Sequence, residues 1–480
     1  MSGLKNKKMN YIFYDFETTG RDSNWDQIIQ VGAILTNSNF QEIDRFDARC
    51  YLLPDIIPYP KAILVNKSSV KDLTQTNLSH FSLIELMIKK FISWGKAIYI
   101  GYNSISFDEE FLRKSLFRNL FNPYYTINNG NKRSDLLNII RANHIYYPDS
   151  LKIPLNEKGR LSFKLDQIAP FNGIKDFNAH DALGDAVATI KLAEIINLQN
   201  PKMWEASLLT ANRESANNEI ENNKLFCITE TFFGKIMPFV VSFICYHPVY
   251  KWAQCFDLKH DPEDYINLNE NSLEHFMSKS PKIIRSIRSN KSPIIMESNF
   301  ISHIDAYKHI SSEELFKRAN IINSNLEFKL KVEKLLNKQA SEKEDFTSQE
   351  DINFEETIYQ SFSNNHEKVI MEEFHSARWE DKIKIANKFK EERNYYFAEK
   401  LIYEENPSLL PEEIFNKINR RIAKKIFSTN DEKWNTIPKA YKEIDDLRAQ
   451  YEDENDQGTL NNLNNLNNLI EDIEKKYQDV

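Results

Sequence analysis

The sequence predicts an α/β protein: an N-terminal α/β domain with a mixed sheet, then a small β-rich domain, then an α-helical C-terminal domain. Three textures along the 480 residues support this order. Apolar segments of strand length alternate with helical patterns in the first part, aromatic and β-branched residues dominate 225–258, and helix-forming residues with hardly any glycine follow residue 326. A chain of this length favours several domains. We predict domains over 1–200, 201–350 and 351–480.

Strands and helices alternate in the predicted first domain. Apolar runs suited to short buried strands occur at 11–14, 28–35 and 97–101. Residues 81–94 place apolar side chains at helical spacing, and further helices are expected from residue 108 and over 181–196. This alternation is typical of an α/β domain.

The predicted second domain begins after Pro201. Its segment 225–258 is interrupted by a glycine and two prolines, which favours short strands in a small sheet or barrel. Downstream, four cations recur every three residues over 282–291. The flanking prolines and isoleucines favour a strand followed by a loop there, either as a solvated face or as one wall of a groove.

Helices are expected in the predicted third domain. Leucines recur every three residues from Leu460 to Leu469, a period that drifts around an α-helix and gives no continuous seam. We therefore expect a frayed terminal helix in this segment. A cluster of cations at 420–425 is interpreted as a solvated helix face.

Composition limits the possible classes of protein. The formal net charge of −8 argues against a surface that coats nucleic acid throughout, but it allows a local basic groove with salt-dependent binding. No apolar run reaches the roughly 18–20 residues that span a membrane, and the N-terminus lacks a signal-peptide pattern. The four cysteines lack the close paired spacing of a zinc site, and we expect reduced thiols in a cytoplasmic protein.

An acidic pair follows the first predicted strand. Asp15 and Glu17 are two residues apart, so their side chains point to the same face of that strand. Adjacent carboxylates repel each other, and a bound Mg²⁺ or Mn²⁺ ion relieves the repulsion. Taken alone, the pair is more typical of a solvated acidic turn.

Two later segments add acids at the ends of predicted elements. Asp108 follows an apolar strand and opens a helix, where it suits either a metal site or the N-terminal end of the helix dipole. Asp185 lies just over one helical turn after His180, so the two side chains can face one space. Histidine titrates near neutral pH and can take a proton from water, although a histidine before a helix is often a cap or surface residue. Asp181 is interpreted as a helix-start acid.

These three motifs, in this order, resemble the DEDD family of 3′–5′ exonucleases, and the histidine before the last acid marks the DEDDh subgroup. The order of the three regions is similar to that of bacterial exonuclease I, with local matches at 121–124, 162–165, 178–182 and 288–294. The resemblance implies an RNase H-like exonuclease domain, an SH3-like second domain and a helical third domain around a basic groove. It also implies a monomeric enzyme of DNA repair and recombination that degrades single-stranded DNA from the 3′ end to 5′-mononucleotides.

The same resemblance assigns a metal site. Two Mg²⁺ ions, for which Mn²⁺ can substitute, would be held by Asp15, Glu17, Asp108 and Asp185. His180 would then activate the attacking water.

The resemblance also nominates contacts to DNA. These are Glu17, Thr18, Phe107, Arg113, Tyr124, Arg141 and Lys164. The family usually carries arginine where Lys164 stands, and lysine keeps the charge but loses the bidentate fork. Solvated helix faces are the alternative for Arg113 and Arg141, and a core or turn position is the alternative for Tyr124.

The resemblance also implies a protein partner, because exonuclease I enzymes bind the acidic C-terminal tail of the single-stranded DNA-binding protein. A tail of this kind needs a cation for its terminal carboxylate. Local alignment nominates Arg318 and Lys329 for this role.

Two other functions are considered. A DEDDh exoribonuclease with accessory domains would share the motifs, because one sequence does not report selection against a 2′-hydroxyl. A non-catalytic nucleic-acid-binding scaffold would keep only the fold. All four acids and the histidine are present, which argues against the scaffold.

Overall fold

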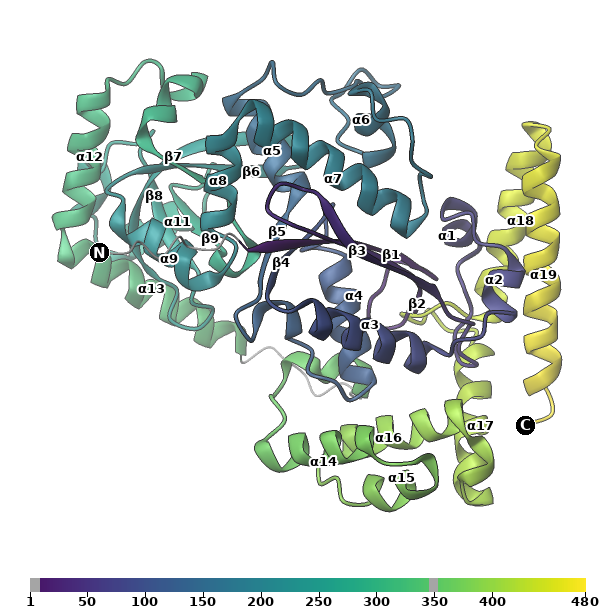
Figure 1. Ribbon diagram of the computed structural model, residues 1–480. Helices are drawn as coiled ribbons and strands as arrows, with labels where there is room; N and C mark the ends of the chain where they lie inside the picture. The colour runs from purple at the N-terminus through teal and green to yellow at the C-terminus, as the bar shows by residue number, and fades with distance from the viewer. Residues whose placement is uncertain (1–8, 345–352) are drawn as a thin grey trace, which may run out of the picture.

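The computed structural model describes residues 9–344 and 353–480 and shows three regions of different architecture (Figure 1). The first two regions each contain a five-stranded sheet with helices, and the described part of the third is helical. Among the described residues, no helix is both long enough and apolar enough to cross a membrane.

The first sheet is mixed, as predicted, with strand order β3-β2-β1-β4-β5. β1 pairs antiparallel with β2 and parallel with β4, and β5 continues the parallel side. β1 extends beyond the predicted segment, so that Asp15 and Glu17 are both strand residues. The strands are β1 (Asn10–Thr18), β2 (Ile28–Thr36), β3 (Glu42–Arg49), β4 (Ala97–Gly101) and β5 (Lys132–Asp135).

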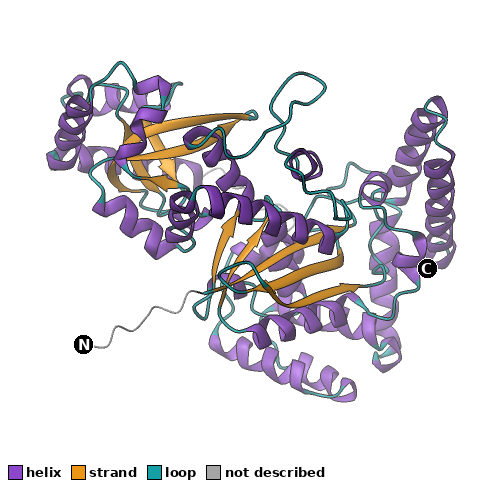
Figure 2. Cartoon of the chain, turned by 45° about the horizontal axis from the view of Figure 1, so that its top comes forward, coloured by secondary structure: helices purple, strands orange, loops and turns teal. Residues whose placement is uncertain are grey.

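Helices cover both faces of this sheet (Figure 2). On one face, Phe91 of α3 packs in a cluster with Tyr14 and Tyr99. On the other face, α5 and α7 pack in a cluster with Phe13, and this cluster continues into the second region through residues such as Phe256. The helices of the first region are α1 (Pro60–Val65), α2 (Val70–Thr74), α3 (His80–Trp94), α4 (Asp108–Arg118), α5 (Leu136–Tyr146), α6 (Leu165–Phe171), α7 (Ala182–Gln199), α8 (Pro201–Leu209) and α9 (Arg213–Asn222), with the 3-10 turn η1 (Tyr125–Ile127).

Two glycines allow close packing at the start of α7, one against β2 and one against the segment that precedes the helix. A Cβ atom on Gly32 would lie 2.2 Å from the backbone nitrogen of Leu183. A Cβ atom on Gly184 would lie 2.2 Å from the carbonyl oxygen of Asn178. A side chain at Gly32 would push the helix start away from the sheet, and one at Gly184 would displace the segment that leads into the helix. This close packing sets where the first turn of α7 meets β1.

The second region confirms the predicted short strands. Its antiparallel sheet has the order β10-β6-β7-β8-β9, and the basic segment 282–291 forms β9 followed by the turn η2. The strands are β6 (Phe226–Phe232), β7 (Lys235–Tyr246), β8 (Ala253–Asp257), β9 (Ile284–Ile287) and β10 (Ile295–Met296). The helices are α10 (Glu263–Ile266), α11 (Glu270–Ser278), α12 (Ser312–Ser324) and α13 (Leu326–Glu344), with the 3-10 turns η2 (Ser289–Lys291), η3 (Ser298–His303) and η4 (Asp305–Tyr307).

The leucine repeat of the third region forms a packed helix, so the expectation of a frayed terminus is wrong. Leu463, Leu466 and Ile470 of α19 are buried, and α19 packs against α18 and also contacts α1 and α2 (Figure 1). The three-residue leucine period alone does not predict this burial, because burial depends on surfaces supplied by elements far away in the chain. The helices are α14 (Asn365–Ser376), α15 (Trp379–Ala386), α16 (Glu392–Glu405), α17 (Glu412–Ile426), α18 (Ile437–Asp453) and α19 (Gln457–Tyr477), with η5 (Phe354–Tyr359) and η6 (Pro407–Leu409).

A buried ion cluster joins the third region to the first. Asp55 is 5% exposed, and its Oδ2 accepts from Lys400 Nζ at 2.8 Å and from Lys425 Nζ at 2.7 Å. Burial opposes the charged form, but the two lysines hold the pKa of Asp55 well below its usual range. The sequence analysis interpreted 420–425 as a solvated helix face. For Lys425 that interpretation is wrong. The first region and the helical region are therefore joined by charge as well as by apolar contact.

Replacing Asp55 with Ala should destabilise the protein by roughly 3–5 kcal/mol, because it removes the carboxylate that two largely buried ammonium groups share. Urea unfolding followed by tryptophan fluorescence would measure the loss. Asp445→Ala is the matched control, because Asp445 is 75% exposed in its pair with Arg448 and should leave the midpoint unchanged. Equal midpoints for the two variants would contradict a stabilising role for the cluster.

Candidate active site

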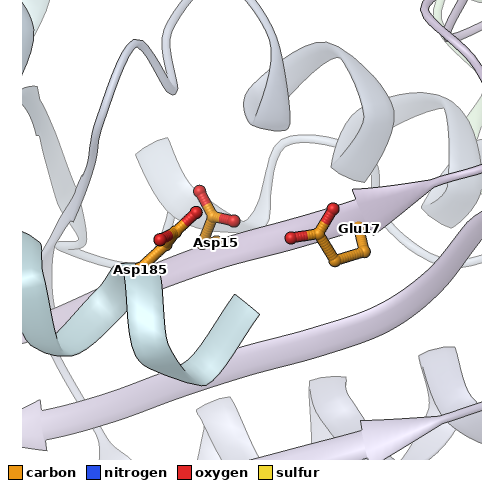
Figure 3. A group of neighbouring side chains, drawn as sticks. All are labelled: Asp15, Glu17 and Asp185. Carbon is orange, nitrogen blue, oxygen red and sulfur yellow. The ribbon is translucent and has the colours of Figure 1, made fainter. Parts of the chain in front are cut away.

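Three carboxylates from two distant segments meet at the end of β1. Asp15 and Glu17 come from β1 and Asp185 from the first turn of α7, and one oxygen from each lies within 4.8 Å of the others (Figure 3). The two strand residues point to the same face, as their spacing predicted. All three side chains are partly buried. The cluster can therefore offer several oxygen ligands to one small space.

Asp108 adjoins this cluster but is not one of the three. It is 2% exposed at the start of α4, and its Oδ1 accepts from the backbone N–H of Phe16 at 3.1 Å. After burial, the charge of Asp108 is the largest cause of the raised pKa of Asp15. The structure thus brings the fourth predicted acid beside the others and also gives it the helix-start position considered as its alternative.

Burial and mutual repulsion disfavour the charged forms of these acids. Burial is the first cause for every one of them, and it raises the pKa of Glu17 to about 8 and that of Asp185 to about 7. The pKa values of Asp15 and Asp108 are also raised well above their usual range. Such a cluster either holds protons at neutral pH or takes up positive charge. A hard divalent cation fits this donor set, which is made of carboxylate oxygens.

His180 lies beside the cluster, and its ring lies next to a further acid, Asp166. Its backbone N–H donates to the carboxylate of Asp185, while its Nε2 lies 3.7 Å from Oδ2 of Asp166 on α6. The sequence placed His180 near the acids correctly and gave no sign of Asp166. Asp181, expected to be a helix-start acid, is the N-cap of α7 and accepts from the N–H of Gly184 at 3.1 Å.

Comparisons with known proteins agree with this geometry. The exonuclease family RNase_T matches residues 12–193, which contain all the acids of the site. Exodeoxyribonuclease I from Buchnera aphidicola subsp. Baizongia pistaciae is 29% identical over 352 residues, covering 69% of this chain and 71% of that protein. Exodeoxyribonuclease I from Escherichia coli K12 is 24% identical over 381 residues, covering 76% of this chain and 79% of that protein.

Solved structures extend the match to the whole chain. E. coli exonuclease I in complex with a dA16 oligonucleotide superposes with a TM-score of 0.82 at 21% identity, covering 97% of this chain and 100% of that one. Exonuclease I from Methylocaldum szegediense gives a TM-score of 0.80 at 20% identity, covering 97% of this chain and 99% of that one. Over most of its length this chain is therefore similar in sequence to exodeoxyribonuclease I and similar in fold to exonuclease I.

Two of the predicted DNA contacts, Arg113 and Tyr124, lie together in this chain. Arg113 is 6% exposed, pairs with Glu109 at 3.7 Å and lies 5.4 Å from the centre of the Tyr124 ring. A solvated helix face is therefore wrong for Arg113. Both residues line a cavity of about 880 Å³, together with Asn290 of the second region and Phe362 of the third. The sequence gave no sign of the last two residues, because only the tertiary fold brings the three regions together.

The other predicted DNA contacts are spread along the first region. Thr18 is buried and its hydroxyl donates to the carbonyl of Gly20, while the Phe107 ring packs on Phe111 with centroids 4.9 Å apart. Arg141 is partly buried on α5, and Lys164 is exposed at the N-cap of α6. Their roles in binding DNA stay predictions.

Buried polar residues that the sequence analysis missed hold the active-site segments. Asp135 accepts from the N–H groups of Asn103 and Ile105, at 3.0 and 3.1 Å, and so fixes the loop before Asp108. Glu109 accepts from Tyr14 Oη and from Arg133 at 2.8 and 2.6 Å. In the sequence, the only indication of a role for Glu109 was its position directly after Asp108.

The two cations nominated for a partner tail occupy different environments. Arg318 is already engaged: it donates to Glu314 at 2.9 Å and to the carbonyls of Leu258 and Lys259, both at 3.1 Å. Lys329 is partly buried on α13. A tail that binds Arg318 would share its guanidinium with these protein acceptors.

The raised pKa values predict how metal affects stability. The folded, metal-free protein keeps protons on Glu17 and Asp185 up to about pH 8 and 7, whereas the unfolded chain releases them near its ordinary values of 4.5 and 3.8. Its stability should therefore fall as pH rises from about 5 to 8. Saturating Mg²⁺ should raise the melting temperature more at pH 8 than at pH 5.5, because fewer protons need to be displaced.

Scanning calorimetry at both pH values, with EDTA as the metal-free reference, would measure this difference. Asp185→Asn should reduce the difference between the Mg²⁺-induced rises in melting temperature at the two pH values. An equal Mg²⁺ effect at both pH values would contradict the proposed protonation of the cluster.

Proposed function

We propose that this chain is an exonuclease I that hydrolyses single-stranded DNA from the 3′ end, releasing 5′-mononucleotides, with two divalent cations at the carboxylate cluster. The observation that supports it most directly is the meeting of Asp15, Glu17 and Asp185, with Asp108 alongside. These four acids come from three separate motifs, so their convergence is a property of the fold. We propose that the enzyme acts in DNA repair and recombination.

Mg²⁺ is the cation we propose, with Mn²⁺ as a substitute, because the donors are carboxylate oxygens. Asp15, Glu17, Asp185 and Asp108 would hold the two ions. Bound there, the ions would activate a water and neutralise charge on the scissile phosphate and on the leaving 3′ oxygen.

The protein's own residues would position the DNA strand and deprotonate the attacking water. His180, which is 36% exposed at its side chain, would take the proton of the attacking water. Glu17 and Thr18 close the end of β1, where the terminal nucleotide would arrive. Lys164 and Arg141 would neutralise phosphates next to the site.

The cavity lined by Arg113 and Tyr124 is our candidate path for the strand. Its walls combine cations with aromatic rings, the combination that binds unpaired bases and phosphates without reading sequence. The dA16 oligonucleotide in the E. coli structure belongs to that protein, and its presence there supports the same substrate class here.

A protein partner is proposed on similar grounds. One solved structure is described as SSB/Exonuclease I in complex with the inhibitor CFAM. We propose that the C-terminal tail of the single-stranded DNA-binding protein binds this chain near Arg318 and Lys329, and that the enzyme acts as a monomer.

A time course with single-stranded DNA labelled at either end tests polarity, product and metal need together. A 3′ label should leave at once as a mononucleotide, a 5′ label should pass through progressively shorter oligomers, and EDTA should stop both. Early release of the 5′ label would contradict the polarity. A matched RNA oligomer tests the exoribonuclease alternative, which predicts that RNA is degraded at least as fast as DNA.

Variants of the acids and the histidine test the roles assigned to them. Asp15→Asn and Asp185→Ala should each abolish cleavage with the melting temperature retained, because each removes a metal ligand. His180→Ala should slow hydrolysis by roughly 10²- to 10⁴-fold, the range of general-base catalysis. Near-normal turnover at neutral pH in the histidine variant would exclude His180 from the mechanism.

A further inference from the structure

His180 has a backbone conformation that must be held in place. Its φ is +63°, in the left-handed region that residues other than glycine seldom adopt. The contact of its N–H with Asp185 is one restraint. Two more come from side chains that lie outside the predicted catalytic set, Lys67 and Asp166.

Lys67 restrains the segment just before His180. Its Nζ donates to the carbonyl oxygen of Ala179 at 3.0 Å, across 112 residues of sequence. Lys67 also has a left-handed backbone, with φ of +53°. A non-glycine residue in this region is strained, and such strain persists where the surroundings hold it.

The loop that carries Lys67 is fixed to the end of β1. The neighbouring Asn66 is 4% exposed, its amide donates to the carbonyl of Thr18 at 3.1 Å, and its Oδ1 accepts from the N–H of Ser68 at 3.2 Å. Lys67 therefore connects the strand end that carries Glu17 to the segment that carries His180.

Asp166 restrains the ring itself. Its Oδ2 lies 3.7 Å from Nε2 of His180, and both side chains are about one-third exposed, at 32% and 36%. Asp166 lies in the first turn of α6, directly after a segment held by the hydrogen bond from Tyr102 Oη to the Phe163 carbonyl at 2.5 Å. A carboxylate beside an imidazole orients it and stabilises the imidazolium that forms when the ring takes a proton.

We propose that Lys67 and Asp166 are positioning residues that set the backbone and the ring of His180 for proton transfer. This inference rests on the proposed function, in which His180 is the general base. Misplacement of a reacting group by about 1 Å is enough to cost roughly 100-fold in rate, so two weak contacts at this point can matter.

A double-mutant cycle tests the proposal. Lys67→Met and Asp166→Asn would be measured in the full chain with Mg²⁺ and oligo-dT, in the wild-type background and again with His180→Ala. In the wild-type background each should lower kcat by roughly 10- to 100-fold with little change in KM. In the His180→Ala background each should have almost no further effect, because its target is gone. Lys67→Arg and Asp166→Glu should recover most of the rate.

Several results would overturn the proposal. Equal fold losses in both backgrounds would mean that these residues act independently of His180, and unchanged kcat in the wild-type background would mean that they do not position it. Lys67→Gly removes the ammonium while allowing the left-handed backbone, so it should lower kcat without lowering the melting temperature. A full rate for this variant would also overturn the role of Lys67.

Controls separate this inference from the proposed function. Lys71→Met removes an exposed lysine four residues along the chain and should leave kcat unchanged. If the unmodified chain released no nucleotides, or if His180→Ala had no effect alone, the proposed function would fail. If both behave as expected and the cycle is additive, only the positioning role fails.

Discussion

Repulsion among partly or fully buried carboxylates is the constraint on which the rest of this structure depends. Asp15, Glu17, Asp108 and Asp185 gain no stability from lying together, and burial disfavours their charged forms. The fold must therefore force them together. It does so by making β1 a central strand and by pressing α7 against β2 at Gly32, where no Cβ atom would fit. The stability sacrificed there is regained only when positive charge enters the cluster.

Neighbouring groups limit how much negative charge accumulates. Asp181 would be a further acid of the cluster, but it caps α7, accepts from Gln30, and pairs with Arg49 at 3.0 Å. Arg49 also lowers the pKa of Glu17, although burial and the other acids outweigh it. Helix capping, charge balance and the attachment of α7 to β2 are thus served by one carboxylate.

The second and third regions complete the surroundings of the first. A continuous apolar core joins the second region to the first, and the Asp55 ion cluster joins the third. The cavity beside Arg113 receives side chains from all three. A catalytic sheet alone would lack these walls, which is a physical reason for the regions to be held together so firmly.

The sequence by itself determined the type of the strongly periodic elements, such as β1, β2 and α3, and the face shared by Asp15 and Glu17, because helical and strand periods are local properties. It gave no sign of β3 and β5. The order of the acidic motifs also indicated the family. Only the tertiary structure decided that His180 faces Asp166, that Arg113 is buried, and that the C-terminal leucines pack against other helices. These features depend on contacts between segments more than ten residues apart, and local periodicity carries no information about such contacts.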